Sequence, residues 1–414
     1  MPGTFVIVGA SLAGAKAAEA LREEGFDGRV VLIGDDPHRP YERPPLSKGY
    51  LMGTEDESAA YVHDEGFYAE HDIEPLLGTR ATAIDRQARE VTYSGAADGR
   101  IRYDKLLLAT GARPRRLNVP GGDDPGLFYL RTMDDSRRLR TALAGGSARV
   151  VVVGAGWIGL EAAAAARSYG CPVTVVEPEE TPLYRALGPE AGGVFADLHR
   201  RNGVELRLRT GVTEIRASGG GYTVVASDGS ELTADVVIVS VGAQPNDDLA
   251  RAAGLETDNG VLVDSALRTA DPDIYAAGDV ANAYHPVLGD RLRVEHWDNA
   301  LNGGPVAARA MLGRDVTYEP VPYFFSDQYD LGMEFAGIVA PGEYDEVVVR
   351  GGVQPNADGA LEFVAFWTSR DRVIAGMNVN IWDVNEHIQE LIRSAVPVDK
   401  AKLSDPSVSL DDLT

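Results

Sequence analysis

The chain has 414 residues, of which 44% are hydrophobic and 25% are charged, as in ordinary globular proteins. This length has room for two or three domains around sizeable cores. The formal net charge of −24 argues against nucleic acid or an anionic membrane as the main partner. The apolar run 150–166 contains three glycines and Glu161, so we predict a buried strand and helix there and no membrane span.

A glycine-rich turn follows the first predicted strand, Thr4 to Val8. It reads Gly9-Ala10-Ser11-Leu12-Ala13-Gly14 and opens a predicted helix. In such turns the glycines allow a tight bend and close approach to a pyrophosphate, which sits at the helix N-terminus. The next strand runs into Asp35 and Asp36, and either acid is placed to bind ribose hydroxyls.

The second glycine-rich turn follows the predicted strand 149–153 and reads Gly154-Ala155-Gly156-Trp157-Ile158-Gly159. Glu177 ends the next predicted strand, 23 residues after Gly154, close to the spacing of roughly 20 in the dinucleotide-binding fingerprint. Two such units predict two dinucleotide sites on one chain. A protein with two dinucleotides usually moves electrons between them.

Strand ends also indicate the domain order. The strand from Lys105 ends in Ala109-Thr110-Gly111, and the second unit closes with an apolar strand before Gly242. A later strand ends at Gly278-Asp279, so we predict that the chain returns to the first domain after Gly242. The predicted domains are 1–113 with 243–322, then 114–242, and an α+β domain at 323–414.

The chain has one cysteine, Cys171. It precedes Pro172 and a predicted buried strand, so we predict a structural role for it and exclude a redox-active cysteine pair. The first predicted strand begins almost at Met1, and we therefore expect no secretory leader and a cytoplasmic protein.

Several motifs carry a family resemblance. They are Pro40-Tyr41-Glu42-Arg43-Pro44-Pro45-Leu46-Ser47-Lys48, Leu108-Ala109-Thr110-Gly111, Gly154 to Glu161, Tyr275-Ala276-Ala277-Gly278-Asp279, Val294-Glu295-His296-Trp297-Asp298-Asn299-Ala300, and Ser326-Asp327-Gln328-Tyr329. On these residues the chain resembles the putidaredoxin-reductase-like family of FAD-dependent, NADH-linked ferredoxin reductases from bacterial oxygenase systems. Apoptosis-inducing factor is a more distant relative. The resemblance covers nearly the whole chain, and the block ending at Lys48 is its most specific part.

The resemblance implies an α/β fold with two Rossmann-like dinucleotide-binding domains in a glutathione-reductase-like arrangement, plus the C-terminal α+β domain. FAD is expected on the first and third segments, NAD(H) on the middle one, and no metal. The implied cofactor-binding residues are Gly9, Ser11, Leu12, Ala13, Gly14, Asp35, Asp36, Arg43, Lys48, Ala81, Ala109, Thr110, Gly111, Arg131, Gly154, Gly156, Trp157, Ile158, Gly159, Glu177, Arg185, Gly242, Gly278, Asp279, Glu295, His296, Trp297 and Phe325.

The resemblance also implies individual roles. Ala81 contacts adenine through its backbone, Asp279 binds the ribityl chain, and Trp297 presents backbone to the pyrimidine end of the flavin. Lys48 and Glu161 are the predicted catalytic pair near the hydride-accepting face. The alternative for these two residues is a loop lysine and a helix-surface glutamate.

Specificity for the nicotinamide cofactor is predicted from Glu177. Its carboxylate can accept hydrogen bonds from both ribose hydroxyls and would repel a 2′-phosphate, which favours NADH over NADPH. Arg185 either contacts the cofactor from the adjoining loop or is a surface residue.

The chain departs from the family pattern at three places. Ser11 stands where glycine is usual: either its Cβ holds the pyrophosphate back slightly, or the site tolerates it. Phe325 replaces a frequent tryptophan, which removes an indole donor while leaving a ring that can stack. Pro305 follows two glycines in an expected helix and would kink or delay it.

The predicted function is an FAD-containing oxidoreductase that carries electrons from NADH to a ferredoxin, [2Fe–2S] or another small iron–sulfur protein, feeding a monooxygenase or a Rieske dioxygenase. One alternative is an NADH oxidase or quinone reductase with a diffusible acceptor. Another is an NADH-sensing redox interaction protein. The oligomeric state, monomer or dimer, stays open.

Overall fold

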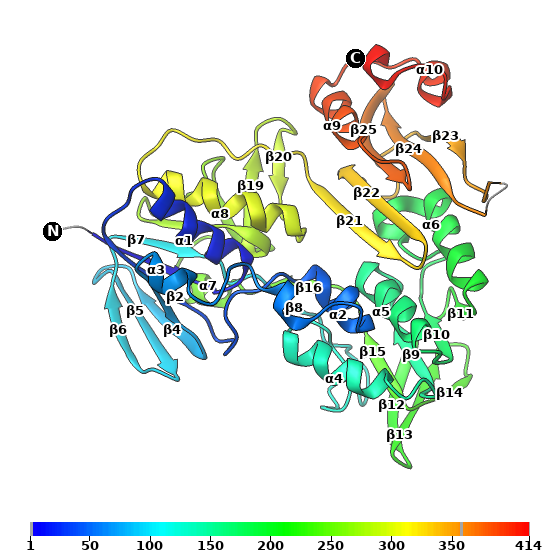
Figure 1. The fold of residues 1–414 in the computed structure, drawn as a ribbon, viewed down its shortest axis with the longest axis horizontal. Coiled ribbons are helices and arrows are strands. Elements are labelled where there is room, and N and C mark those ends of the chain that lie inside the picture. The colour runs from blue at the N-terminus through cyan, green and yellow to red at the C-terminus, as the bar shows by residue number, and fades with distance from the viewer. Residues whose placement is uncertain (1–2, 357–358, 414) are drawn as a thin grey trace. The chain divides into compact units, whose positions relative to one another are not determined.

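The computed structural model describes residues 3–356 and 359–413 (Figure 1). The chain divides into two compact units, each assembled from three segments. Unit 1 comprises Met1–Arg43, Glu57–Arg113 and Ala243–Pro322, and unit 2 comprises Pro44–Asp56, Pro114–Gly242 and Tyr323–Thr414. Among the described residues, the helices are too short or too polar to cross a lipid bilayer.

A five-stranded parallel sheet forms the centre of unit 1, with the strand order β18-β7-β1-β2-β3. The strands are β1 (Thr4–Val8), β2 (Arg29–Ile33), β3 (Ile73–Leu76), β7 (Lys105–Leu108) and β18 (Ile274–Ala276). Most of their side chains are buried, because a parallel sheet is covered on both faces. The carboxyl ends of these strands therefore share one edge, where ligands bind in such sheets.

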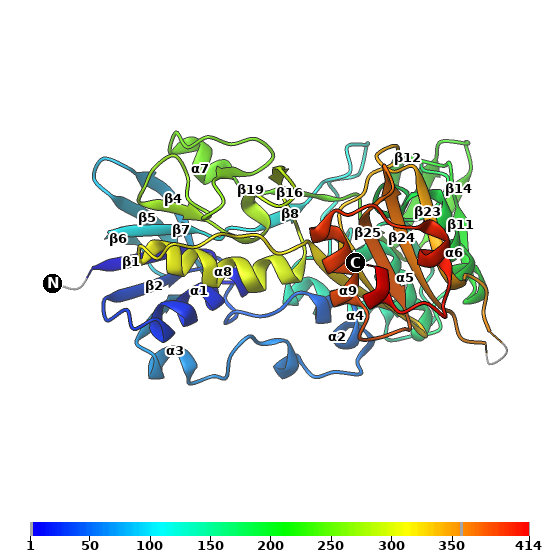
Figure 2. The ribbon, with the colours of Figure 1, turned by 90° about the horizontal axis from the view of Figure 1, so that it is seen from above.

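Two helices of unit 1, α1 (Leu12–Glu23) and α8 (Trp297–Met311), lie side by side (Figure 1 and Figure 2). A Cβ added to Gly304 would lie 2.3 Å from the carbonyl oxygen of Ala13, so glycine lets the two helices approach closely. The expected delay of this helix at Pro305 is wrong, because α8 begins at Trp297 and continues through Pro305. Proline removes one hydrogen bond of the helix, and in this stretch α8 packs closely against α1.

Smaller elements complete unit 1. Two three-stranded sheets have the orders β4-β5-β6 and β17-β19-β20, and β8 pairs with β16. The bounds are β4 (Thr79–Asp85), β5 (Glu90–Gly95), β6 (Gly99–Arg102), β8 (Ala112–Pro114), β16 (Ala243–Pro245), β17 (Val261–Val263), β19 (Ala281–His285), β20 (Asp290–Leu292), η2 (Glu57–Ala60), α3 (Phe67–Glu70), α7 (Asp248–Ala252) and η3 (Gly278–Val280).

Unit 2 contains a second parallel sheet, with the strand order β11-β10-β9-β15. The valine-rich strands of this sheet alternate with helices as a βαβ pattern requires. A smaller antiparallel sheet, β12-β13-β14, follows. The bounds are η1 (Pro44–Ser47), α2 (Gly49–Met52), α4 (Met133–Leu143), β9 (Val150–Val153), α5 (Trp157–Ser168), β10 (Val173–Val176), α6 (Tyr184–Arg201), β11 (Val204–Arg207), β12 (Val212–Ser218), β13 (Gly221–Ala226), β14 (Glu231–Ala234) and β15 (Val236–Val239).

The C-terminal part of unit 2 is a five-stranded antiparallel sheet, β21-β22-β25-β24-β23, with α9 beside β25 (Figure 2). Its elements are β21 (Tyr323–Gln328), β22 (Leu331–Gly337), β23 (Glu346–Gly352), β24 (Glu362–Ser369), β25 (Arg372–Val379), α9 (Asn385–Ser394), α10 (Lys400–Ser404) and η4 (Leu410–Leu413).

The C-terminal sheet and α6 share a core. Trp367 is fully buried and donates its indole N–H to the carbonyl of Leu187 at 3.0 Å. That carbonyl is available because Gly188, with φ of 76°, breaks the regular geometry of α6. The predicted domain 323–414 thus lies in one compact unit with the predicted NADH domain, while the functional division into three domains stays a prediction.

Candidate dinucleotide sites and a buried lysine–glutamate pair

The first glycine-rich turn connects β1 to α1 and depends on its outer glycines. Gly9 has φ of +122°, and a Cβ there would lie 2.0 Å from the carbonyl oxygen of Ala109. A Cβ on Gly14 would lie 1.9 Å from the carbonyl oxygen of Gly9. Ser11 is the N-cap of α1, has extended backbone and makes no capping hydrogen bond through its side chain. Leucine and alanine follow it at the buried start of the helix.

The two acids after β2 differ in their surroundings. Asp36 accepts hydrogen bonds from the backbone N–H of His38 at 3.0 Å and from the hydroxyl of Tyr41 at 2.6 Å. Asp35 is exposed and pairs with Arg80 at 2.8 Å. Asp36 is therefore the more firmly held of the two candidate ribose ligands.

Further predicted FAD residues lie at the carboxyl ends of the parallel strands of unit 1. Ala109 follows β7, and the Thr110 side chain donates to the carbonyl of Asn246 at 2.8 Å. Gly111 and Gly278 both have positive φ, and a Cβ on Gly278 would lie 3.1 Å from the side chain of Ala13. The ends of β7 and β18 therefore meet the start of α1.

Other predicted FAD residues lie on β4 and near Tyr41. Ala81 is a half-buried residue of β4, opposite Tyr93 beside a β-bulge. The guanidinium of Arg43 lies 5.6 Å from the ring of Tyr41.

The start of α8 gathers the remaining candidates of unit 1. Asp279 lies in η3, His296 is the N-cap of α8 and Trp297 is its first residue, while Glu295 is exposed and pairs with Arg293. Burial lowers the pKa of His296 to about 4, and the charge of Asp279 opposes that shift.

Next to this cluster, burial raises the pKa of Glu42, and a hydrogen bond with Trp297 opposes the rise.

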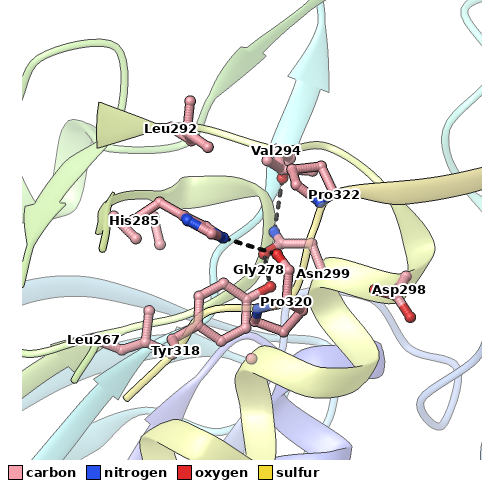
Figure 3. Close-up of a pocket in the computed structure, with 13 residues that line it drawn as sticks. Leu267, Gly278, His285, Leu292, Val294, Asp298, Asn299, Tyr318, Pro320 and Pro322 are labelled. Carbon is pink, nitrogen blue, oxygen red and sulfur yellow. Dashed lines mark hydrogen bonds between the residues drawn. The ribbon is translucent and has the colours of Figure 1, made fainter. Parts of the chain in front are cut away.

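A small, partly open cavity of about 20 Å³ lies beside Gly278 (Figure 3). Its polar wall is internally bonded: Tyr318 donates to the Asn299 amide oxygen at 2.6 Å, and His285 hydrogen-bonds the carbonyl of Pro320 at 2.9 Å. The cavity has space for about one water molecule. It is too small for a further organic ligand.

The second glycine-rich turn, in unit 2, connects β9 to α5. Gly154 has φ of +99°, and a Cβ there would lie 2.2 Å from the carbonyl oxygen of Ser240. A Cβ on Gly159 would lie 2.3 Å from the carbonyl oxygen of Gly154. Gly156, the N-cap of α5, has φ of −78°, and its Cβ would have no heavy atom within 4 Å. The fold needs the outer two glycines, whereas Gly156 leaves open space at the helix N-terminus.

Glu177 lies beside this turn. Its carboxylate accepts the backbone N–H of Ala155 at 2.7 Å and that of Glu179 at 2.9 Å. Arg185 pairs with Glu179 at 3.0 Å, and its side chain is 84% exposed. The structure therefore brings Glu177 to the turn and leaves Arg185 on the surface.

The other candidates of the second turn and its surroundings lie in three places. Trp157 packs edge-on against Phe195 and Phe324, whereas Ile158 is exposed. Gly242 has φ of +95°. Arg131 precedes α4, and its backbone N–H donates to Asp135 at 3.3 Å.

A buried ion pair is present in unit 2, between Lys48 Nζ and Glu161 Oε1 at 2.8 Å. Lys48 is the N-cap of α2, and Glu161 lies in α5 with a side chain 5% exposed. Ser326 donates to Oε1 of this carboxylate at 2.7 Å and Ser47 donates to Oε2 at 2.5 Å. The glutamate is therefore a buried, fully bonded carboxylate, and the alternative of a surface residue does not hold.

Two neighbours complete the surroundings of the ion pair. Lys48 Nζ lies 5.3 Å from the ring centre of Phe325, within the range of a cation–π contact. Burial raises the pKa of Asp327; the charge of Lys48 opposes that rise and the charge of Glu161 adds to it. Phe325 thus places an aromatic ring beside the lysine.

Both glycine-rich turns fit the pyrophosphate group of a dinucleotide. In each, the backbone bends as only glycine allows, and a helix of 12 residues begins with its N–H groups directed out of the turn. The second turn adds a carboxylate for a ribose. Glycine at position 156, where a Cβ would have no neighbour, leaves space that a phosphate group can approach.

Comparison with models of protein families shows to which family the chain belongs. Residues 3–304 match the family model described as pyridine nucleotide-disulphide oxidoreductase. The chain belongs to this family. Residues 323–414 match the model described as the reductase C-terminal domain. Members of this oxidoreductase family use FAD and NAD(H).

Individual relatives of this oxidoreductase cover the whole chain. The ferredoxin–NAD(+) reductase component of the anthranilate 1,2-dioxygenase system of Burkholderia cepacia is 42% identical over 98% of each chain. Putidaredoxin reductase of Pseudomonas putida is 38% identical over 99% of this chain and 96% of its own. A crystal structure of the covalent putidaredoxin reductase–putidaredoxin complex matches with a TM-score of 0.92 and 36% identity, over 99% of this chain and 97% of that chain.

These comparisons confirm the predicted family, fold class, oxidoreductase activity and pair of cofactors. The roles of single residues stay predictions. Sequence reasoning missed the two serines on Glu161, although Ser47 and Ser326 lie inside motifs that carried the resemblance. The two motifs support membership of the family, but they do not indicate which residue each serine contacts.

Proposed function

We propose that the protein is an FAD-containing reductase that transfers electrons from NADH to a small iron–sulfur ferredoxin. The observation that carries the proposal is a pair of dinucleotide-binding turns in a chain whose single cysteine is buried. Cys171 is fully inaccessible, and burial raises the pKa of its thiol. Because no thiol pair can take the electrons, they must pass to a separate acceptor. The names of the anthranilate dioxygenase reductase and of putidaredoxin reductase support a ferredoxin.

The residues of the chain would mainly bind and orient the cofactors. The N-termini of α1 and α5 offer backbone N–H groups to the two pyrophosphates. FAD, when bound, supplies the chemistry that links a two-electron hydride donor to a one-electron acceptor. We assign to Lys48 the role of a fixed cation beside the reacting ring, with Glu161 holding its ammonium group. Such a cation favours negative charge on the ring.

The acidic residues after β10 favour NADH over NADPH. The carboxylate of Glu177 is aimed at the turn by two backbone N–H groups. Glu179 and Glu180 follow it, paired with Arg185 and Arg209. A 2′-phosphate placed here would face the carboxylate of Glu177, whereas ribose hydroxyls can donate hydrogen bonds to it.

The ferredoxin would in turn feed a monooxygenase or a Rieske dioxygenase. We further propose a cytoplasmic location, because a soluble ferredoxin would be available there as the electron acceptor. An NADH oxidase or quinone reductase is the rival enzyme, and an NADH-sensing interaction protein is the rival outside catalysis. The rivals differ from the proposal in the acceptor that NADH oxidation requires.

An anaerobic assay with three acceptors tests this function. Purified holoprotein and NADH are mixed with a [2Fe–2S] ferredoxin, with a quinone, or with no acceptor. We expect bleaching of the ferredoxin at a rate that saturates with its concentration. Fast quinone reduction without reduction of any ferredoxin in a panel would establish the rival enzyme. A long-lived reduced protein that passes electrons to neither acceptor would establish the sensor.

A further inference from the structure

A line of buried polar side chains runs through unit 2 from α6 to α5. Tyr329 contacts His199 Nδ1 at 3.3 Å, and His199 Nε2 contacts the amide oxygen of Gln328 at 2.8 Å. Gln328 Nε2 donates to the hydroxyl of Ser326 at 3.1 Å, and Ser326 donates to Glu161 Oε1 at 2.7 Å. His199, Gln328 and Ser326 are each at most 1% exposed. None of them is needed to hold the backbone of a turn or a helix end.

In every hydrogen bond of this line, the donor is the partner farther from the Glu161 carboxylate and the acceptor is the nearer one. A carboxylate only accepts, so Ser326 must give its proton to Glu161. The oxygen of Ser326 then accepts from the Gln328 amide, whose own oxygen requires a proton on His199 Nε2. His199 Nδ1 is left as the acceptor for the Tyr329 hydroxyl. Donor and acceptor roles are thus fixed from one end to the other.

The secondary structure explains how the line reaches Glu161. Ser326 and Gln328 are two residues apart on β21, so their side chains leave the same face of the strand. One of them contacts α5 through Glu161, and the other contacts α6 through His199. The edge strand of the C-terminal sheet therefore ties together two helices of the segment that carries the second glycine-rich turn.

We propose that His199 and Gln328 are positioning residues for the reductase: through Ser326 they fix the carboxylate that holds Lys48. The inference rests on the proposed function only in that the Lys48–Glu161 pair serves hydride transfer. Burying three neutral polar side chains gives no packing advantage over apolar ones of the same size. Aligned hydrogen bonds that end on one buried anion polarise one another in a low-dielectric interior. The arrangement therefore restrains the carboxylate at the Oε1 atom that also binds the lysine.

Two substitutions at position 199 separate positioning from packing. Glutamine and methionine have nearly the same length and volume, but only glutamine keeps an N–H that can replace His199 Nε2–H. The measurement is the single-turnover rate of flavin reduction by NADH in the holoprotein, with FAD content and melting temperature checked in each variant. We expect His199→Met to slow reduction about fivefold, the worth of roughly one neutral hydrogen bond. His199→Gln should stay within about twofold of the wild type.

Substitutions at position 328 test the direction of the line. Burial beside Glu161 raises the pKa of the carboxyl group in Gln328→Glu, so this variant is measured above that pKa. The ionised carboxylate then only accepts, and Ser326 turns its proton toward residue 328 and away from Glu161. Gln328→Met removes the link without reversing it. Flavin reduction should therefore slow in the order wild type, Met, Glu, with the KM for NADH little changed. Gln389→Glu on α9 is the control, because Gln389 donates to Asn385 outside the line.

Equal rates for His199→Met and His199→Gln, or a Gln328→Glu variant as fast as the Met variant, would overturn the proposal. If His199→Met does not fold, the pair at position 328 decides the question. The readout is flavin reduction, which does not involve the final acceptor. A protein that reduces no ferredoxin would therefore contradict the proposed function while leaving this test intact.

Discussion

Replacing Gly156 with alanine should weaken NADH binding without harming the fold. Gly156 has φ of −78° and ψ of 178°, which alanine adopts freely, and the added Cβ would meet no heavy atom within 4 Å. Alanine at such a position stabilises a protein by about 0.4–1 kcal/mol through the unfolded chain. The same Cβ would occupy the space that a pyrophosphate approaches. Losing one charge-assisted hydrogen bond there, about 1.5–3 kcal/mol, corresponds to roughly a 10- to 150-fold rise in the KM for NADH.

The assay combines steady-state NADH oxidation with ferricyanide as acceptor and a thermal melt of the same preparation. Gly154→Ala is the contrasting variant, because φ of +99° and the Ser240 carbonyl at 2.2 Å make any side chain incompatible with the fold. We expect Gly154→Ala to lower the melting temperature and Gly156→Ala to maintain it or raise it slightly. A Gly156→Ala protein with an unchanged KM for NADH would refute the placement of the pyrophosphate at the start of α5.

Three further predictions concern the other candidate residues. Glu177→Ala should narrow the NADH over NADPH preference in kcat/KM about tenfold or more, because the repulsion of a 2′-phosphate is lost; an unchanged ratio would contradict its role. Asp279→Ala should lose FAD on dialysis, seen as a fall in flavin absorbance per protein, while full retention would contradict the ribityl assignment. Burial lowers the pKa of His199 to about 4 from 6.5, so the unfolded chain takes up this proton first as the pH falls. The free energy of unfolding should therefore drop by up to ~3 kcal/mol more in the wild type than in His199→Gln between pH 6.5 and 4, measured by urea titration.

The parts of the fold that the sequence predicts are those that depend on residues close together in the chain. The two βαβ units follow from glycine spacing and apolar strands, which act over some 25 residues, and Glu177 reaches its turn as the spacing indicates. Pro305 shows the limit of such rules. Its cost to a helix is a local property, whereas the close contact of Gly304 with Ala13 is made by segments almost 300 residues apart.

The buried Lys48–Glu161 pair shows the same difference between features that nearby residues determine and contacts between distant segments. Lys48 could be predicted as functional because it ends a distinctive block, and its ion pair with Glu161 is present. The side chains behind that pair carry no comparable signal. His199 lies in an ordinary helix and contacts Gln328, 129 residues later. Hydrogen bonds of that range depend on how the C-terminal sheet packs on the helices, which no periodicity in the sequence encodes.

The inaccessible thiol of Cys171 makes the protein a convenient scaffold for chemical labelling. Its sulfur is enclosed beside the carbonyl of Leu143, 3.7 Å away, so maleimides should leave the native wild-type chain unmodified. A cysteine introduced at an exposed position would then be the one site that reacts. A dye or spin label attached there could report where an electron carrier docks, without first replacing the native cysteine.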